Sequence, residues 1–83
     1  MTNKNTMYEE IFLGMYQSID FMVQAYNNKD NDRNHVNYGS ATAYAKIMQS
    51  MGHEVDLRVY SKDGYLLTDY IVVDDKKFDF FHN

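Results

Sequence analysis

The residues of this chain that could carry out chemistry are few and dispersed. There is no cysteine, which removes thiolate nucleophiles, disulfides and cysteine-bound zinc. The three histidines, His35, His53 and His82, lack the paired spacing of a site such as His-x-x-x-His. We therefore expect no metal and no cofactor, and we interpret each histidine as an exposed or helix-end residue.

Ser40 is a candidate nucleophile, because a serine can attack a carbonyl group when a base lies beside it. The surrounding segment reads Tyr-Gly-Ser-Ala-Thr and lacks the Gly-x-Ser-x-Gly elbow of serine hydrolases. A capping or packing role for Ser40 is favoured. A small hydrolase or acyl-transfer enzyme in which Ser40 works with His35 or His53 remains the alternative.

Carboxylates gather in the C-terminal part of the chain. Asp74 and Asp75 are adjacent, which is typical of a turn. Asp69 interrupts an apolar stretch. In a regular strand it would share a face with Leu67 and Ile71, where it needs a hydrogen-bond partner. An edge position for Asp69 is the simpler interpretation.

Two helices are expected to position these residues. Thr6 and Glu9 fit a capping box at the start of the first helix, and apolar residues recur at helical spacing as far as Tyr26. Gly14 interrupts this helix at a cost of up to about 1 kcal/mol relative to alanine, which suggests close packing there. The second helix is expected to begin near Asn37, a good N-cap residue, and to end before Gly52.

The segment Asn27–Asn34 between them has no apolar residue and is expected to be a polar loop. Its alternating Asp30 and Asp32 resemble the start of a calcium loop. An EF-hand needs glycine at the sixth position and glutamate at the twelfth, and this chain has His35 and Ala41 there. The spacing therefore argues against calcium.

After Gly52 the period changes from helical to alternating. The chain is expected to form strands and turns in this order: strand Val55–Tyr60, turn Lys62–Gly64, strand Tyr65–Val73, turn Asp74–Lys77 and strand Phe78–Phe81. The order ααβββ predicts a single α+β domain over residues 1–83, in which a three-stranded antiparallel meander packs on two helices.

Residues 37–81 resemble the minimal core of papain-like and transglutaminase-like proteins. The resemblance rests on the Asn37-Tyr38-Gly39 opening, the helix-ending Gly52, and the strands beginning at Asp69 and Lys77. It implies that Tyr38 stands in the position of the catalytic cysteine, Asp69 in that of the histidine and Asp79 in that of the triad aspartate. Two of these three positions depart from the family pattern, so the resemblance implies a degenerate member that works by binding.

Charge and hydropathy narrow the function classes. The net charge is −4, which argues against nonspecific nucleic-acid binding through Lys and Arg. No apolar run approaches the roughly 18 residues of a membrane span, and the polar N-terminal segment lacks the apolar core of a signal peptide. We expect a soluble cytoplasmic protein with no membrane partner.

A small non-enzymatic interaction protein is therefore the predicted function. It would be an inhibitor or adaptor that binds a protein partner, of the kind that a phage or mobile element encodes. Besides the Ser40 enzyme, a second alternative to this function is an acidic nucleic-acid mimic. Lys62, Lys76 and Lys77, however, interrupt the carboxylates of the C-terminal part of the chain. The residues expected to bind the partner are Tyr38, Tyr60, Tyr65, Asp69, Tyr70 and Asp79, because tyrosine is favoured at interface hot spots.

Overall fold

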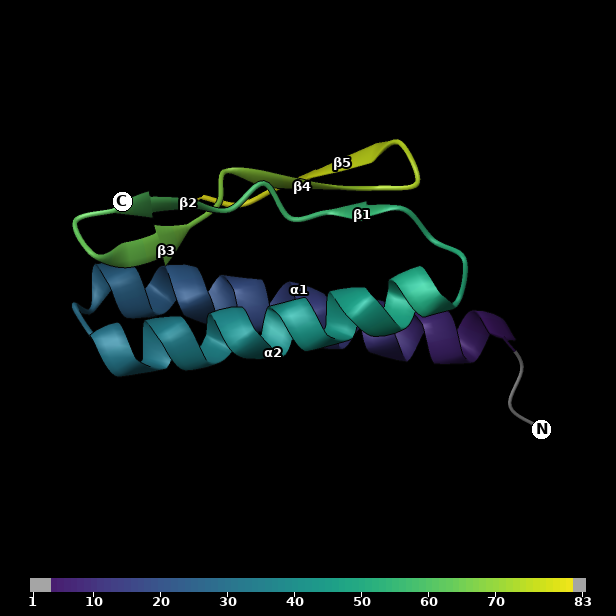
Figure 1. The fold of residues 1–83 in the computed structure, drawn as a ribbon, viewed down its shortest axis with the longest axis horizontal. Helices are drawn as coiled ribbons and strands as arrows, with labels where there is room; N and C mark the ends of the chain where they lie inside the picture. Colours follow the sequence, from purple (N-terminus) through teal and green to yellow (C-terminus); the bar gives the residue numbers. More distant parts are fainter. Residues whose placement is uncertain (1–3, 82–83) are drawn as a thin grey trace.

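Two long helices lie side by side and antiparallel, and short strands cover one side of the pair (Figure 1). The computed structural model describes residues 4–81. The helices are α1 (Lys4–Asn27) and α2 (Asn31–Ser50). The strands are β1 (Val55–Asp56), β2 (Tyr60–Lys62), β3 (Tyr65–Leu67), β4 (Tyr70–Val73) and β5 (Lys76–Asp79). The predicted α+β class, with two helices followed by antiparallel strands, is confirmed.

Both helices begin earlier than the sequence suggested. Asp30, in an extended conformation with φ −103°, caps α2 by accepting a hydrogen bond from the Arg33 backbone N–H at 3.1 Å. The second helix therefore starts at Asn31, not at Asn37, and the predicted loop shrinks to residues 28–30. Thr6 is likewise inside α1 rather than at its N-cap, because that helix already includes Lys4.

The predicted three-stranded meander is wrong in detail, since the strands form two small antiparallel sheets. One sheet has the order β1-β4-β5, with β4 in the centre, and the other is the hairpin β2-β3. The segment 57–59 connects β1 to β2, and the segment 68–69 with the start of β4 runs opposite it. Between the last pair of β2-β3 and the first pair of β1-β4, three residues (57–59) therefore lie opposite four residues (68–71). This is a β-bulge, and it divides what would otherwise be one long hairpin.

The bulge has two local causes. Arg58 takes a left-handed conformation, with φ 52°, and its backbone N–H donates to Asp56 Oδ1 at 3.1 Å. Opposite it, the buried Thr68 hydroxyl lies 2.7 Å from Leu57 O and 2.8 Å from Tyr70 O, and donates to one of them. In its shortest contact, with Leu57 O, the hydroxyl takes the place of a strand-to-strand backbone bond.

The core lies between the helix layer and the strand layer. Each helix contributes one apolar stripe and the strands contribute alternate residues, as the periodicity predicted. The buried apolar side chains are Met15, Ile19, Met22, Val23, Ala41, Ala45, Met48, Leu67, Ile71, Val73 and Phe80. Met22 and Met48 are fully buried, so they serve the core rather than a binding surface.

Asn34 joins three elements inside this core. Its side chain is fully buried, accepts from Leu66 N–H at 2.7 Å and donates to Leu66 O at 2.8 Å. It also donates to Met22 O of α1 at 2.8 Å. The amide therefore makes the two bonds to β3 that a neighbouring strand would make, and it ties that strand to both helices.

The hairpin β2-β3 is held by neighbours of Asn34 as well. Asn31 Nδ2 donates to Gly64 O at 3.0 Å, and His35 Nε2 lies 3.1 Å from the same oxygen. Residues 31, 34 and 35 lie on one side of α2 because residues three and four apart are neighbours on a helix. The polar stretch that suggested a loop is therefore the side of α2 that binds the hairpin.

Replacing Asn34 with alanine should lower the free energy of unfolding by about 3–5 kcal/mol, because buried backbone groups of Leu66 lose their partners at about 1–3 kcal/mol each. Urea unfolding followed by circular dichroism measures this. Asn37→Ala is the matched control: Asn37 is also on α2, and its amide donates only to Arg33 O of the same helix. Equal losses for the two variants would contradict this role of Asn34.

Gly14 marks a close approach, as expected. A Cβ at this position would lie 2.6 Å from Cζ of Tyr44, so the tyrosine ring of α2 occupies the space beside the glycine. The contact fixes how α1 and α2 lie against each other.

Gly14→Ala should therefore stabilise the protein by up to about 1 kcal/mol only when Tyr44 is also shortened to alanine. With Tyr44 present, the ring must move and the gain in helix propensity should be lost or reversed. A double-mutant cycle by urea unfolding measures the difference. The same stabilisation in both backgrounds would show that the ring does not constrain this position.

Candidate interaction surface

Tyr70 is the centre of the side-chain arrangement on the face of β4 that points away from the helices. It precedes the buried Ile71 in the alternating pattern of that strand. The guanidinium carbon of Arg58 lies 5.1 Å from the Tyr70 ring centroid, and the Lys77 ammonium nitrogen lies 4.6 Å from it. Two cation–π contacts therefore fix the ring at the surface.

Carboxylates balance these cations. Arg58 lies 3.5 Å from Asp56, and Lys77 lies 3.6 Å from Asp79, which is also the partner of Tyr70 across β4 and β5. All four charged side chains are largely exposed, so each pair contributes at most about 1 kcal/mol to stability. Their main effect is to hold the aromatic ring and the charges in a defined geometry.

Asp69 lies at the bulge, where its side chain is exposed. The Tyr60 hydroxyl donates to its Oδ1 at 2.9 Å. Burial, and then this hydrogen bond, raise the pKa of Tyr60, so the phenol stays protonated and keeps donating. Asp69 does not share a covered face with Leu67 and Ile71, the arrangement that a regular strand would give, because Thr68 occupies the buried position and the strand is not regular.

Tyr38 borders a groove of about 410 Å³ between α2 and the chain from β1 to β2. Arg58 lines the same groove, and so connects Tyr38 with the Tyr70 contacts. Tyr38 lies inside α2, not at a helix N-terminus, which is where the papain-like resemblance had placed it. Of the other positions in that resemblance, Gly52 follows the helix, Asp69 precedes β4 and Asp79 ends β5.

Tyr65 makes its ring contact with the helix layer. Its ring packs edge-on against Tyr26 of α1, with centroids 5.4 Å apart, and Lys62 lies over the same Tyr26 ring at 5.7 Å. The six predicted residues thus make separate contacts: Tyr70 is paired with Asp79, Tyr60 with Asp69, Tyr38 borders the groove that Arg58 lines, and Tyr65 packs on Tyr26. We call the resulting set the Tyr70 surface; its residues are Tyr38, Arg58, Tyr60, Asp69, Tyr70, Lys77 and Asp79.

The sequence prediction missed Arg58 and Lys77. Lys77 was assigned to a turn. Its reach to the Tyr70 ring depends on the strand register, which places Lys77 opposite Val72, two residues from Tyr70 on β4. Arg58 was assigned to a regular strand, and its position depends on the left-handed bulge conformation. No local sequence signal indicates either contact.

His53 and Asp74 form a second polar arrangement, at the other end of the sheet. His53 Nδ1 lies 2.6 Å from Asp74 Oδ2, and Asp74 Oδ1 accepts from Glu54 N–H at 2.9 Å. The Tyr8 ring of α1 packs on the imidazole with centroids 4.4 Å apart. These contacts attach the β4–β5 turn to the end of α2 and to α1.

Electrostatics support this attachment. The Glu54 backbone N–H, and then His53, hold the pKa of Asp74 below its ordinary value. Burial, and then the Asp74 charge, raise the pKa of Tyr8. A histidine held at Nδ1 by a carboxylate has the orientation of a general base. Within residues 4–81, however, no hydrogen bond joins Ser40 to His53 or to His35, whose ring faces Gly64 O.

Residues 4–81 contain no group of three or more His, Cys, Asp or Glu side chains placed to hold a metal ion. Neither α1 nor α2 has a stretch long and apolar enough to cross a bilayer. His82 lies outside the described residues.

Comparisons of this chain with protein-family models, with curated proteins and with solved structures give no match.

Asp74→Asn should reduce stability, and the reduction should depend on pH. Because the folded-state pKa of Asp74 lies below the ordinary value of 3.8, its charge stabilises the fold above that value and stops doing so as the pH falls through the folded-state pKa. The difference between wild type and variant should therefore be larger near about pH 5 than near about pH 2–3. Urea unfolding across this range measures it.

Asp75→Asn is the matched control, since Asp75 is the exposed second residue of the same turn. Its effect should change less with pH. A pH-independent loss for Asp74→Asn would contradict an electrostatic role.

Proposed function

We propose that this protein is a small non-enzymatic interaction protein, an inhibitor or adaptor that binds a protein partner through the Tyr70 surface. One observation carries the proposal: the Tyr70 ring is held at the surface between Arg58 and Lys77. Tyrosine and arginine are enriched among the residues that contribute most to protein–protein binding.

The rigidity of this surface supports the proposal further. A side chain that is already fixed loses little conformational entropy on binding, and that loss costs about 0.5–1.5 kcal/mol for each side chain that binding must immobilise. Tyr60 is 39% exposed and is oriented by Asp69. The exposed charges around the rings would form the polar rim that is typical of an interface.

The alternatives have less support from the geometry. A nucleic-acid mimic should present an uninterrupted row of carboxylates, whereas Asp56 and Asp79 each lie beside a cationic side chain. A Ser40 enzyme needs a base within hydrogen-bond reach of that serine, and the nearest approach to such a dyad, His53 with Asp74, makes its contacts elsewhere. The degenerate papain-like relationship is compatible with a binding function and stays a prediction.

The test is affinity capture with tagged protein from native extract, with quantitative mass spectrometry of the recovered proteins. Tyr70→Ala and Lys77→Ala should each lower recovery of a specific partner at least about 10-fold, the effect of a loss of about 1.4 kcal/mol. Lys29→Ala is the matched control for Lys77→Ala, because Lys29 is an exposed lysine in the turn between the helices. Circular dichroism verifies that each variant is folded.

Recovery of no specific protein by the wild-type chain would count heavily against the proposal. So would equal recovery by Lys77→Ala, Tyr70→Ala and the control.

A further inference from the structure

The side of the helix pair that faces away from the strands has its own ordered pattern. Core residues of α1 and α2 form one stripe per helix, but a second stripe with alternating spacings of three and four follows the opposite side. On α1 it occupies positions 7, 10, 14, 17, 21 and 24 and continues to position 28 in the following turn, and on α2 it occupies positions 33, 36, 40, 43 and 47. This spacing of 3.5 residues is the one by which helices pack side by side in coiled coils and bundles.

These two stripes, which we call the back face, carry exposed apolar side chains between polar ones. Four of their large side chains are substantially exposed: Val36 (67%), Phe21 (51%), Met7 (50%) and Ile47 (43%). Gly14, on the same stripe of α1, lies against the Tyr44 ring of α2. The strands cover only the other side of the helix pair, so nothing among residues 4–81 covers this face (Figure 1).

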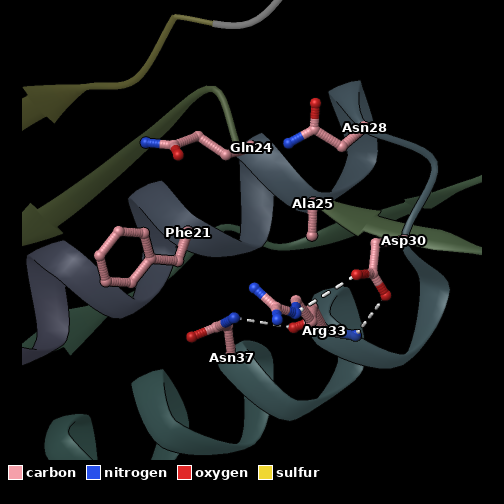
Figure 2. A pocket seen from close by; sticks show the side chains of 7 residues that line it. All are labelled: Phe21, Gln24, Ala25, Asn28, Asp30, Arg33 and Asn37. Atoms are coloured by element: carbon pink, nitrogen blue, oxygen red, sulfur yellow. Dashed lines mark hydrogen bonds and ion pairs between the residues drawn. The ribbon is translucent and has the colours of Figure 1, made fainter.

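Charges are almost absent from the back face, and their positions are informative. Of its twelve positions, only Glu10 and Arg33 are charged, and they lie near opposite ends. The Arg33 side chain is 81% exposed and lies in a groove that it shares with Phe21, with Asp30 at 3.4 Å on one side of its guanidinium (Figure 2). Its remaining N–H groups are available to another carboxylate.

The contacts between the helices show where each charge lies along the common helix axis, which we call its level. Asn34 is bonded to Met22 and Tyr44 lies against Gly14, so Arg33 is level with about position 24 of α1. Glu10 and Arg33 are therefore each about seven residues, or roughly 10 Å, from the level of Gln17. A twofold axis perpendicular to the helices at that level brings Glu10 of one copy level with Arg33 of the other.

In the other face-to-face arrangement the twofold axis is parallel to the helices. Glu10 of one copy would then be level with Glu10 of the other, and Arg33 with Arg33. Charge complementarity thus selects the first arrangement. We propose that the back face binds a second copy of this chain, so that two helix pairs form an antiparallel four-helix layer with the strands outside. The Tyr70 surface is on the opposite side of each copy and stays free.

The available area is sufficient for such a dimer. Two adjacent helices of about 30 Å, each about 10 Å wide, present roughly 600 Å² per copy, or about 1,200 Å² in total. That is the lower end of the range for specific interfaces. A stable but concentration-dependent dimer is therefore expected.

Sedimentation equilibrium of the whole chain between about 5 and 500 μM tests the proposal, because mass action shifts the balance from monomer to dimer as the concentration rises. The expected result is a mass approaching twice 9.8 kDa as concentration rises. Phe21→Glu should raise the dissociation constant at least about 100-fold, because it buries an unpaired charge in the interface. Val36→Lys tests the same face from α2 if Phe21→Glu does not fold.

Phe81→Glu is the matched control, since Phe81 is 90% exposed but follows β5 in the strand layer. It should leave the dimer unchanged. Glu10→Arg and Arg33→Glu should each weaken the dimer about 10-fold, and the double reversal should restore most of the affinity.

A chain that stays monomeric to about 500 μM overturns the proposal, and would leave the back face to a different protein. A dimer that tolerates Phe21→Glu and Val36→Lys, or one that the charge reversal does not restore, also overturns it. None of these outcomes affects the proposed role of the Tyr70 surface, which Tyr70→Ala and Lys77→Ala test separately.

Discussion

The fold depends on the buried amide of Asn34. A two-stranded hairpin is marginal by itself, and a strand edge buried against helices leaves backbone groups without partners. Asn34 supplies both missing bonds to Leu66 and a third to Met22. One side chain thereby replaces a strand neighbour and fixes the distance between the hairpin and both helices.

The bulge between the two small sheets determines the surface chemistry. Had the strands continued regularly, Arg58 and Asp69 would have followed the alternation of a single hairpin. The left-handed Arg58 and the buried Thr68 hydroxyl break that alternation instead. As a result, an arginine reaches the Tyr70 ring and Asp69 turns outward to Tyr60.

The two outer sides of the molecule differ in character. The strand side carries aromatic rings with charges paired around them, so its polar groups are largely satisfied within the molecule. The helix side carries exposed apolar side chains and two charges near its opposite ends, of which Arg33 lies 3.4 Å from Asp30. The first is suited to selective recognition of a partner, and the second to burial against a matching face.

The sequence by itself determined the α+β class, the apolar stripe of each helix and the turn at Lys62–Gly64. Each of these follows from local periodicity or from a residue's own conformational preference. Other features were decided only by the tertiary structure. The early start of α2 depends on bonds from Asn31 and Asn34 to β-hairpin backbone, and the division of the sheet depends on Thr68 filling a buried gap. Of the predicted binding residues, Tyr70 and Asp79 meet because of strand register, whereas Tyr65 is drawn to Tyr26 of the helix layer. Such contacts join residues distant in the chain, and local pattern carries no information about them.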